Sequence, residues 1–494
     1  MSYVLALDQG TTGSTALVID ESGGVVGRGY REIAQHYPRP GWVEHDPAEL
    51  LDRTVAAGRE AIAAAGVPPG SIRALGLTNQ RETVVTWDPA SPTTAPKAIV
   101  WQDRRTTDAI TALSPHASRV AQVTGLTLDP YFSGTKMGWL LEKMDAKDRR
   151  KMHIGTVDTW LLWNLTGGRV YATEPTNASR TMLYDIDRKT WSPEMGELLG
   201  VPIQALADVR PSSGVFGTTE ASFFGAPIPI AGIAGDQQSA LYGQGCHAPG
   251  TGKVTYGTGA FLLVNQGNHR PDVGQGILTT IACDARGAAC YATEAAIFIA
   301  GAAIQWLRDG LGIIAAAGET EALARSVSST DGVYFVPALT GLGAPHWEPR
   351  ARGTIVGVTR GTTRAHFVRA ALEAMAYSTG DVLGAMHAHL PALRVDGGAS
   401  MNNWLMQFQA DVLDVPVERP DMVETTAAGA AGLAGLATGV WSSPDEFLEG
   451  RHFTRFDPGA GRTAARAGAA GWTTAVDTAL YWARSYIEGH GQTR

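Results

Sequence analysis

Short apolar runs separated by turns rich in glycine and hydroxyl groups dominate the start of the chain. Val4–Leu7 and Ala16–Ile19 flank the turn Asp8–Gly13, and this pattern predicts a β-hairpin. Pro47–Ala65 has the spacing of a helix, with Asp46 as its N-cap. Three further runs predict strands: Ala74–Leu77, Thr83–Thr86 and Ala98–Trp101. Strands alternating with helices predict an α/β architecture.

The strand–turn–strand pattern returns in the second half of the chain. Lys253–Tyr256 and Ala260–Val264 flank a Gly-Thr-Gly turn, and an earlier strand is predicted at Ile228–Ala234. Leu393–Asp396 is a strand followed by a glycine turn, and residues 402–413 are predicted to form a helix. We therefore expect two similarly built lobes, 1–247 and 248–494, the second ending in a helical tail.

The composition indicates a compact chain rather than a disordered or collagen-like one. Of 494 residues, 44% are hydrophobic, only 18% are charged, and 59 are glycines without a three-residue period. The net charge of -8, without a stripe of Lys and Arg, argues against a nucleic-acid partner. Cys246, Cys283 and Cys290 form neither a disulfide framework nor a zinc motif, and the N-terminus lacks the basic region of a signal peptide. A reducing, cytoplasmic setting is expected.

One stretch without charged residues, Thr425–Pro444, is nearly as long as a membrane span. Gly429, Gly432, Gly435 and Gly439 recur through it, and its bulky apolar residues are few. This composition predicts a tightly packed buried helix, with a membrane span as the alternative. We expect no stable membrane insertion.

The turn Asp8–Gly13 has the residue types of a phosphate site. Glycines let backbone N–H groups point into one concavity, and Thr11 and Thr12 add hydroxyl donors. Asp8 would repel phosphate unless a cation intervenes, so it is a candidate ligand of Mg²⁺, directly or through water. An ordinary hairpin turn is the alternative for this turn alone. Similar turns at 255–259 and 396–400 could join it in clamping a triphosphate.

With these turns the chain resembles the actin–hexokinase–Hsp70 ATPase superfamily, and within it the FGGY family of carbohydrate kinases. The resemblance extends from about Tyr3 to about Trp441. It rests on stretches that occur in the family's order: Trp42–Pro47, Asn79–Glu82, Val100–Arg105, Asp129–Lys136, Thr176–Leu183, Ala234–Gln238 and Gly341–Trp347. It implies a two-lobed, ribonuclease H-like (actin-like ATPase) α/β fold with a central cleft, and phosphoryl transfer from ATP to glycerol.

The resemblance implies a glycerol site made of hydrogen-bonding side chains and an apolar wall. Arg81 offers donors and Glu82 offers acceptors at the end of a predicted strand, with a surface salt pair as the alternative. The other substrate-binding residues are Trp101, Tyr131, Asp236, Gln237 and Phe261. For the aromatic side chains the alternative is core packing.

Asp236 ends an apolar strand and is the candidate general base. A carboxylate at this place can accept the proton that the glycerol hydroxyl loses as it attacks the γ-phosphoryl group. Together with Asp8, Asp236 is also a candidate ligand of Mg²⁺, possibly through water in either case, as the acidic side chains of kinase sites commonly are. A role as N-cap of the following helix is the alternative, and it is compatible with catalysis.

For ATP, the resemblance implies contacts from glycines and polar side chains of both lobes. The predicted residues are Thr11, Thr12, Gly13, Thr258, Gly301, Gln305, Gly398 and Asn402. Gly301 and Gly398 would let the nucleotide approach the backbone, and Asn402 would meet polar atoms of adenine or ribose. A plain strand-to-helix turn is the alternative for Gly398. A homodimer or homotetramer is expected.

Three positions depart from the family's pattern. Thr15 stands where many relatives carry Arg, which removes a positive charge beside the phosphate turn. Ser222–Pro227 is shorter than the loop with which some relatives bind fructose 1,6-bisphosphate and has no Arg, so no such inhibition is expected. Ser222 takes the place of a phosphorylatable His, so we do not expect activation through that His.

Three other functions remain as alternatives. Another FGGY kinase, acting on a pentulose or tetritol, would share Asp236 and the turns but would need a different wall around the polyol. An actin- or Hsp70-like ATPase would turn over ATP without glycerol. A sugar-kinase-like repressor would need a DNA-binding segment before Val4, which we do not expect.

Overall fold

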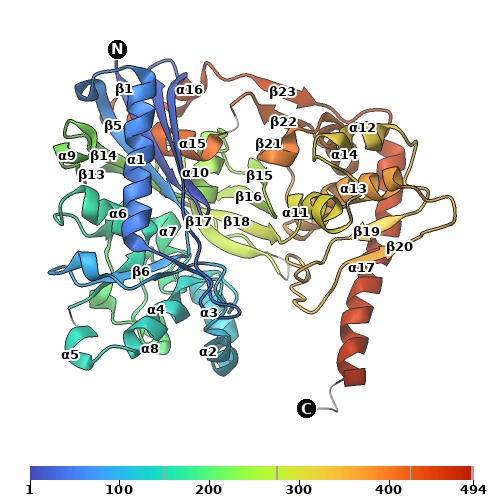
Figure 1. Cartoon of the computed structure of the whole chain (residues 1–494), viewed down its shortest axis with the longest axis horizontal. Coiled ribbons are helices and arrows are strands. Elements are labelled where there is room, and N and C mark those ends of the chain that lie inside the picture. Colours follow the sequence, from blue (N-terminus) through green and yellow to red (C-terminus); the bar gives the residue numbers. More distant parts are fainter. Residues whose placement is uncertain (150, 274–275, 423, 491–494) are drawn as a thin grey trace.

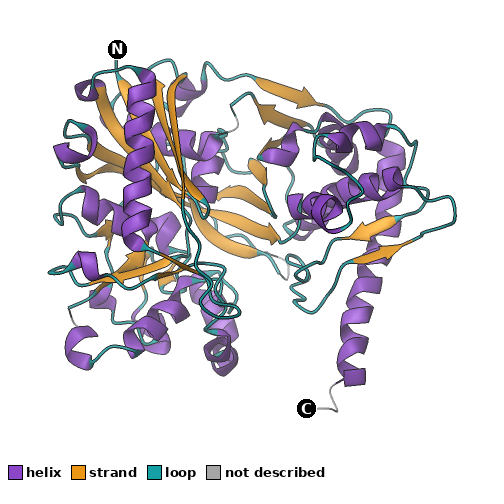
Figure 2. Cartoon of the chain, in the orientation of Figure 1, coloured by secondary structure: helices purple, strands orange, loops and turns teal. Residues whose placement is uncertain are grey.

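The computed structural model describes residues 1–149, 151–273, 276–422 and 424–490. Two large sheets, one built mainly by each half of the chain, form the centre of two lobes (Figure 1). Figure 2 shows helices around both sheets, including helices that lie between them, and the strands of the second sheet reach towards the first. The predicted alternation of strands and helices is therefore confirmed.

The first sheet has the strand order β13-β14-β5-β1-β2-β3. Its strands are β1 (Tyr3–Gln9), β2 (Gly13–Asp20), β3 (Val25–Glu32), β5 (Ile72–Asn79), β13 (Ser213–Thr218) and β14 (Pro229–Gly235). β1 pairs with β2 in antiparallel, as the predicted hairpin requires, and with β5 in parallel. Along β1, Leu5 and Leu7 enter one hydrophobic cluster and Val4 and Ala6 another, so both faces of the sheet are buried.

Helices cover both faces of this sheet. On one face lie α1 (Pro47–Ala65) and α6 (Val157–Leu165), and on the other lies α15 (Thr425–Thr438). The helix α1 has its predicted bounds because the Asp46 carboxylate accepts hydrogen bonds from the first-turn N–H groups. Gly66, with φ of 65°, ends the helix in the left-handed conformation.

The second sheet has the strand order β17-β18-β16-β15-β21-β22-β23. Its strands are β15 (Gly252–Tyr256), β16 (Ala260–Gly267), β17 (Leu278–Cys283), β18 (Ala289–Ile297), β21 (Leu393–Asp396), β22 (Val417–Pro420) and β23 (Phe453–Phe456). The helices of this lobe are α11 (Gly301–Gln305), α12 (Glu319–Arg325), α13 (Arg364–Ala385), α14 (Asn403–Leu413) and α17 (Arg462–His490). The second predicted hairpin is confirmed, since β15 and β16 pair in antiparallel.

Smaller elements complete both lobes. A four-stranded sheet beside α6 contains β4 (Glu44–His45), β6 (Val84–Trp87), β7 (Ala98–Ile99) and β8 (His153–Thr156). The short strands are β9 (Ala172–Thr173), β10 (Tyr184–Asp185), β11 (Thr190–Trp191), β12 (Asp208–Val209), β19 (Tyr334–Val336) and β20 (Thr354–Val356). The remaining helices are α2 (Thr107–Ala112), α3 (Ala117–Thr124), α4 (Ser133–Glu142), α5 (Ala146–Arg149), α7 (Pro175–Ala178), α8 (Pro193–Leu199), α9 (Ala221–Phe224), α10 (Asp236–Gly243) and α16 (Pro444–Leu448).

The uncharged stretch forms α15, and it belongs to the first lobe rather than the second. Its alanines pack on β1, β2, β5 and β14, and Trp441 and Phe447 join the same cluster. The chain therefore crosses back into the first lobe after β22, so a single cut at residue 247 does not separate the two packed bodies. The division of the chain into 1–247 and 248–494 is one along the sequence, and α15 packs on the first sheet because its small side chains fit closely against it.

The predicted close packing of α15 is confirmed by its crossing with α10. A Cβ on Gly429 would lie 1.8 Å from the carbonyl oxygen of Ser239, and one on Gly243 would lie 2.1 Å from that of Thr425. Within the described residues, no helix combines the length and apolar character that a membrane span requires. The alternative reading of this stretch as a membrane span is therefore wrong.

Candidate active site

Three neighbouring strands of the first sheet bring the predicted polyol and metal residues to one edge. β5 pairs in parallel with β14, where Asn79 lies opposite Gly235, and with β1, where Asn79 lies opposite Gln9. Because parallel strands end at a common edge, the residues at and after these ends lie close together. Asp236 directly follows β14, Arg81 comes two residues after the end of β5, and Asp8 is the penultimate residue of β1.

The short helix α7 contacts the ends of β5 and β14 at this edge through hydrogen bonds. Glu174 caps α7 and accepts hydrogen bonds from the hydroxyl and the N–H group of Thr176. The Thr176 hydroxyl in turn accepts a 2.8 Å hydrogen bond from the N–H of Gly235, the residue before Asp236. Asn177 exchanges side-chain hydrogen bonds with Asn79 at 3.0 and 3.1 Å. These contacts hold the ends of β5 and β14 in register.

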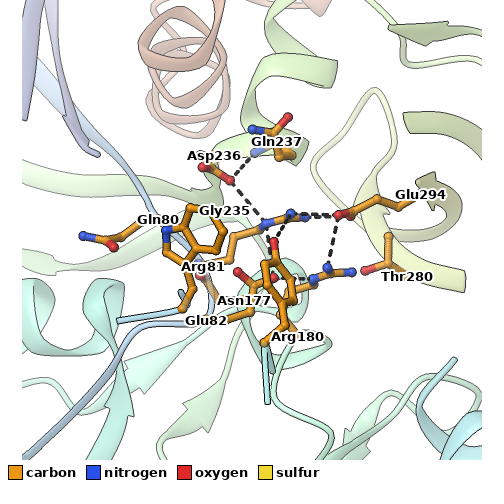
Figure 3. Close-up of polar contacts among 12 residues, drawn as sticks. Gln80, Arg81, Glu82, Asn177, Arg180, Gly235, Asp236, Gln237, Thr280 and Glu294 are labelled. Carbon is orange, nitrogen blue, oxygen red and sulfur yellow. Dashed lines mark hydrogen bonds and ion pairs between the residues drawn. The ribbon is translucent and has the colours of Figure 1, made fainter. Parts of the chain in front are cut away.

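Arg81 and Glu82 are buried, each 2% exposed, so the alternative of a surface salt pair is wrong. Nη1 and Nη2 of Arg81 donate to Oε2 and Oε1 of Glu294, at 2.7 and 2.8 Å (Figure 3). Nε of Arg81 lies 3.2 Å from Oδ1 of Asp236 and 3.6 Å from Oε1 of Glu82. The principal partner of Arg81 is therefore Glu294, not its sequence neighbour.

Arg180 completes a buried network of four side chains, which we call the charge lattice: Arg81, Glu82, Arg180 and Glu294. Arg180 donates from Nε to Oε1 of Glu82 at 2.7 Å and from Nη2 to Oε1 of Glu294 at 3.1 Å. Burial opposes ionisation of Glu294, but Arg180 and Arg81 outweigh it and hold the pKa of this carboxyl at about 2. Glu294 is thus ionised at neutral pH.

Sequence reasoning missed both Arg180 and Glu294 as site residues. Arg180 lies within one of the stretches that carry the family resemblance, Thr176–Leu183. Glu294 is the only charged residue of β18, Ala289–Ile297. A single acid inside an otherwise apolar and hydroxyl-bearing strand was the signal available, because a buried charge needs a partner.

Two of the three predicted aromatic residues lie against the lattice. The rings of Trp101 and Tyr131 meet edge to face, with centroids 5.5 Å apart. The hydroxyl of Tyr131 accepts from Nη2 of Arg81 at 3.4 Å, and Nε1 of Trp101 donates to the hydroxyl of Thr11 at 2.8 Å. Trp101 therefore joins the predicted polyol wall to the first phosphate turn. Phe261 lies partly buried on β16, opposite Ala296 of β18.

Asp236 begins α10, and Gly235 takes the N-cap position, so the alternative role of Asp236 as N-cap is wrong. Its side chain is 30% exposed, in contrast to the buried charge lattice beside it. Burial by the surrounding protein raises the pKa of Asp236, while Arg81 acts in the opposite direction. The arrangement leaves an accessible carboxylate next to a fixed guanidinium.

Gln237 is held by a lysine that sequence reasoning also missed. Lys253 on β15 is fully buried and donates to Oε1 of Gln237 at 2.5 Å and to the hydroxyl of Thr255 at 2.7 Å. Burial lowers the pKa of Lys253 to about 8, although Asp396 and Asp236 favour its charged form. With its oxygen engaged, Gln237 has its amide N–H groups left for another partner.

Asp8 lies partly exposed near Asp236 and could share a cation with it. Burial and repulsion from Asp236 raise the pKa of Asp8 to about 7. Across the β-ladder, Asp8 lies opposite Thr15. No cluster of three or more His, Cys, Asp or Glu side chains suited to a metal occurs in the part of the chain that the structure describes. Two carboxylates still suit Mg²⁺, which keeps several waters and takes other ligands from phosphate.

The first two predicted phosphate turns are tight backbone turns. In the first, the N–H of Gly10 donates to the carbonyl of Gly13 at 2.9 Å, and Thr12 is exposed. In the second, the carbonyl of Thr258 accepts from the N–H groups of Ala300 and Ala302, which ties the turn to the start of α11. A Cβ on Gly301 would lie 2.6 Å from the carbonyl oxygen of Gly257, so this position requires glycine.

The third turn follows β21, which pairs in parallel with β15 and so places this turn beside the second one. Gly397 has φ of 82°, and its Cβ would lie 2.3 Å from the carbonyl oxygen of Tyr256. Gly398, the predicted residue, has open space around it, so the turn itself requires Gly397. Asn402 is the N-cap of α14 and also donates to the hydroxyl of Thr320 at 3.2 Å. Gln305 is exposed at the end of α11.

Comparison with known proteins agrees with this geometry. Residues 3–243 match the N-terminal domain, and residues 252–438 the C-terminal domain, of the FGGY family of carbohydrate kinases. The chain is 50% identical to glycerol kinase 2 of Thermotoga maritima, with 98% of this chain and 99% of the relative covered. It is also 50% identical to a glycerol kinase of Pseudomonas putida, with 97% of each covered.

Solved structures confirm the predicted two-lobed fold. The glycerol kinase of Plasmodium falciparum, solved with ADP, superposes with a TM-score of 0.89 at 33% identity, covering 97% of this chain and 98% of that one. The xylulose kinase of Rhodospirillum rubrum has a TM-score of 0.86 at 22% identity, covering 98% and 100%, and so shares the fold. The chain belongs to the FGGY family of carbohydrate kinases.

Proposed function

We propose that this chain transfers the γ-phosphoryl group of ATP to glycerol, giving sn-glycerol 3-phosphate and ADP, the first step of glycerol catabolism. The observation that carries the proposal is the 50% sequence identity, over nearly the whole chain, to relatives named glycerol kinase. The accessible Asp236 beside buried Arg81 and Glu82 supports it, because a neutral triol needs donors, acceptors and a base at one place.

Asp236 acts as the general base in this proposal. Its carboxylate accepts the proton of the terminal hydroxyl as that oxygen attacks the γ-phosphorus. Arg81, with Nε 3.2 Å from Oδ1, keeps the base fixed and favours its ionised form. Placement at the first turn of α10 adds the favourable end of the helix dipole.

The polyol is bound beside the buried charge lattice, by Glu82 and by the neighbours of the lattice. Glu82 uses Oε1 for Arg180, which leaves Oε2 as an acceptor for a hydroxyl. Gln237 contributes amide donors, while Trp101, Tyr131 and Phe261 supply the apolar wall for the carbon chain.

ATP is bound between the three glycine turns, by Thr11, Thr12, Gly13, Thr258, Gly301, Gln305, Gly398 and Asn402. Asp8 and Asp236 would hold Mg²⁺, in part through water, and the ion would neutralise charge on the phosphates. Two lobes that each supply phosphate turns would close around the substrates and exclude water. The division at residues 247 and 248 is proposed as the boundary of the two FGGY halves.

The setting and control of the enzyme are part of the proposal. We infer a cytoplasmic enzyme that forms a homodimer or homotetramer. Ser222–Pro227 contains no Arg, and Arg59 of α1 is engaged by the carbonyls of Ser222 and Phe223 at 2.9 and 2.7 Å. Inhibition by fructose 1,6-bisphosphate and activation through a phosphorylated His are not expected.

A polyol panel with ATP and Mg²⁺, followed by an ADP-coupled assay, tests the function. Glycerol should give the highest kcat/KM, ahead of erythritol and xylulose, and omission of Mg²⁺ should abolish turnover. Preference for xylulose or erythritol would instead show that the chain is an FGGY kinase acting on another polyol or sugar. Glycerol-independent ATP turnover with filament formation would support an assembly ATPase instead.

A further inference from the structure

Glu294 belongs to the second sheet, but among the described residues its side chain forms hydrogen bonds only with residues of the first lobe. Its carboxylate accepts three hydrogen bonds, from Nη1 and Nη2 of Arg81 and from Nη2 of Arg180, at 2.7, 2.8 and 3.1 Å (Figure 3). Glu294 is 1% exposed, so no solvent competes for these bonds. The neighbouring strand is also anchored to the first lobe, since Gln238 donates to the carbonyl of Ile281 at 3.0 Å.

The bidentate contact decides how the Arg81 guanidinium is oriented. Both of its terminal nitrogens are committed to Glu294, so the planar fork cannot rotate without breaking two bonds. Only Nε then faces Asp236, at 3.2 Å. If Glu294 lost its charge, the fork would turn towards the nearest carboxylates that remain, Asp236 and Glu82, and would occupy the acceptors that a hydroxyl needs.

Arg180 has the matching effect on Glu82. Its Nε holds Oε1 at 2.7 Å, and the same guanidinium is held by Glu294 through Nη2. Its Nη1 is buried and has no hydrogen-bond partner within the residues that the structure describes. A group placed only for stability would be expected to satisfy all its donors, because an unpaired buried donor is costly. Holding Glu82 in one orientation accounts for the arrangement.

We propose that Glu294 and Arg180 are positioning residues for polyol binding, which hold Arg81 and Glu82 in the orientation that leaves acceptors free for substrate hydroxyls. The proposal rests on the proposed polyol site. It makes a second-sheet residue part of the first lobe's binding surface, so the polyol site is complete only when both lobes are in contact.

Steady-state kinetics of Glu294→Gln tests the proposal. The variant keeps the shape of the side chain and removes its charge. We expect the KM for glycerol to rise about 10- to 100-fold, the range for hydrogen bonds to charged groups, while the KM for ATP stays within twofold. A purely structural role would lower the active fraction, reducing kcat with both KM values unchanged, and that result would overturn the proposal.

Glu373→Gln is the matched control, because Glu373 forms a buried ion pair with Arg369 on α13, at 2.8 Å. Its two KM values should equal those of the wild type. If Glu294→Gln does not fold, Glu294→Asp keeps the charge but is one methylene shorter, so its carboxylate cannot reach Arg81 at the same distances. Its glycerol KM should rise at least about threefold, a smaller loss of the same kind of bond. An unchanged glycerol KM in that variant would overturn the proposal.

Failure of the proposed function can be distinguished from failure of the positioning role of Glu294 and Arg180. A wild-type chain that phosphorylates another polyol but not glycerol would contradict glycerol as substrate. The same variants assayed with that polyol would then decide the role of Glu294 and Arg180 separately.

Discussion

At the crossing of α10 and α15, an interatomic distance allows the effect of one substitution on stability to be estimated. A Cβ on Gly429 would lie 1.8 Å from the carbonyl oxygen of Ser239, whereas real Cβ contacts essentially never fall below 3.0 Å. Gly429→Ala therefore requires the two helices to separate by about 1.2 Å, the difference between these distances. Both contacting atoms are fixed to the backbone, so no side-chain rotation can relieve the overlap.

The energetic cost should exceed the gain in helix propensity. Replacing glycine by alanine inside a helix contributes about 1 kcal/mol. Overpacking a core costs about 1–3 kcal/mol, and more where the backbone must move. A gap of this size also weakens the dispersion contacts of the alanines that α15 packs on the first sheet. We expect a net loss of about 2 kcal/mol, the upper cost of about 3 kcal/mol less the gain of about 1 kcal/mol. In a chain of 494 residues this corresponds to a Tm lower by roughly 2–4 °C.

Catalysis should suffer as well, because Asp236 is the first residue of α10. Displacing this helix moves the proposed base relative to the bound substrates, and a misplacement of about 1 Å can cost about 10²-fold in rate. Thermal unfolding and the ADP-coupled assay, run at a temperature where the variant is folded, measure the two effects. A Tm at or above the wild-type value would refute the reasoning about the crossing.

Gly380→Ala is the matched control for this substitution. Gly380 lies in the interior of α13, and its Cβ would meet Leu413 and Val412 at 3.6 Å, an ordinary van der Waals distance. The same chemical change should therefore stabilise the chain by about 0.5–1 kcal/mol. Opposite signs for the two variants would show that backbone approach, rather than glycine content, decides the result.

Three further predictions concern single side chains. Asp236→Asn should keep the wild-type Tm and lower kcat about 10²–10⁴-fold in the coupled assay, and near-normal turnover would remove Asp236 from the role of base. Lys253→Met removes the donor to Oε1 of Gln237, so the glycerol KM should rise about 10-fold, and an unchanged KM would contradict the contact's importance. Burial raises the pKa of Asp381 to about 6, opposed by a hydrogen bond from Trp472. The folded chain then holds a proton that the unfolded chain releases near pH 3.8, so stability falls as pH rises from about 4 to about 6. Asp381→Asn should raise stability by about 2–3 kcal/mol at pH 7.5 and leave it unchanged near pH 3.5, and an equal effect at both pH values would exclude this titration.

Local signals account for the parts of the fold that could be predicted. The bounds of α1 follow from Asp46 as N-cap and Gly66 as a left-handed C-cap, both of which act within one turn of the helix. The two hairpins follow from apolar runs interrupted by glycine turns. These features depend on neighbouring residues alone, so one sequence suffices to find them.

Contacts between distant segments account for what could not be predicted. Glu294 binds Arg81 across 213 residues and Arg180 across 114. Nothing in the pattern around these residues specifies which buried acid meets which buried base. The position of α15 on the first sheet has the same origin, since a helix of small residues fits any closely spaced surface. The contacts of Glu294 and the position of α15 both depend on segments that lie far apart in the sequence.

The charged side chains of the site are arranged in a way that suits a neutral substrate. The groups that surround the proposed polyol position balance one another in sign. The cations are Arg81, Arg180 and Lys253, and the anions are Glu82, Glu294 and Asp236. Because glycerol carries no charge, the positive and negative side chains of such a site must compensate one another before the substrate binds. Asp8 stands outside this balance, and its pKa of about 7 reflects burial and the repulsion of Asp236. A site that binds phosphates should place its uncompensated acid where a divalent cation can neutralise it, and we propose that Asp8 has this role.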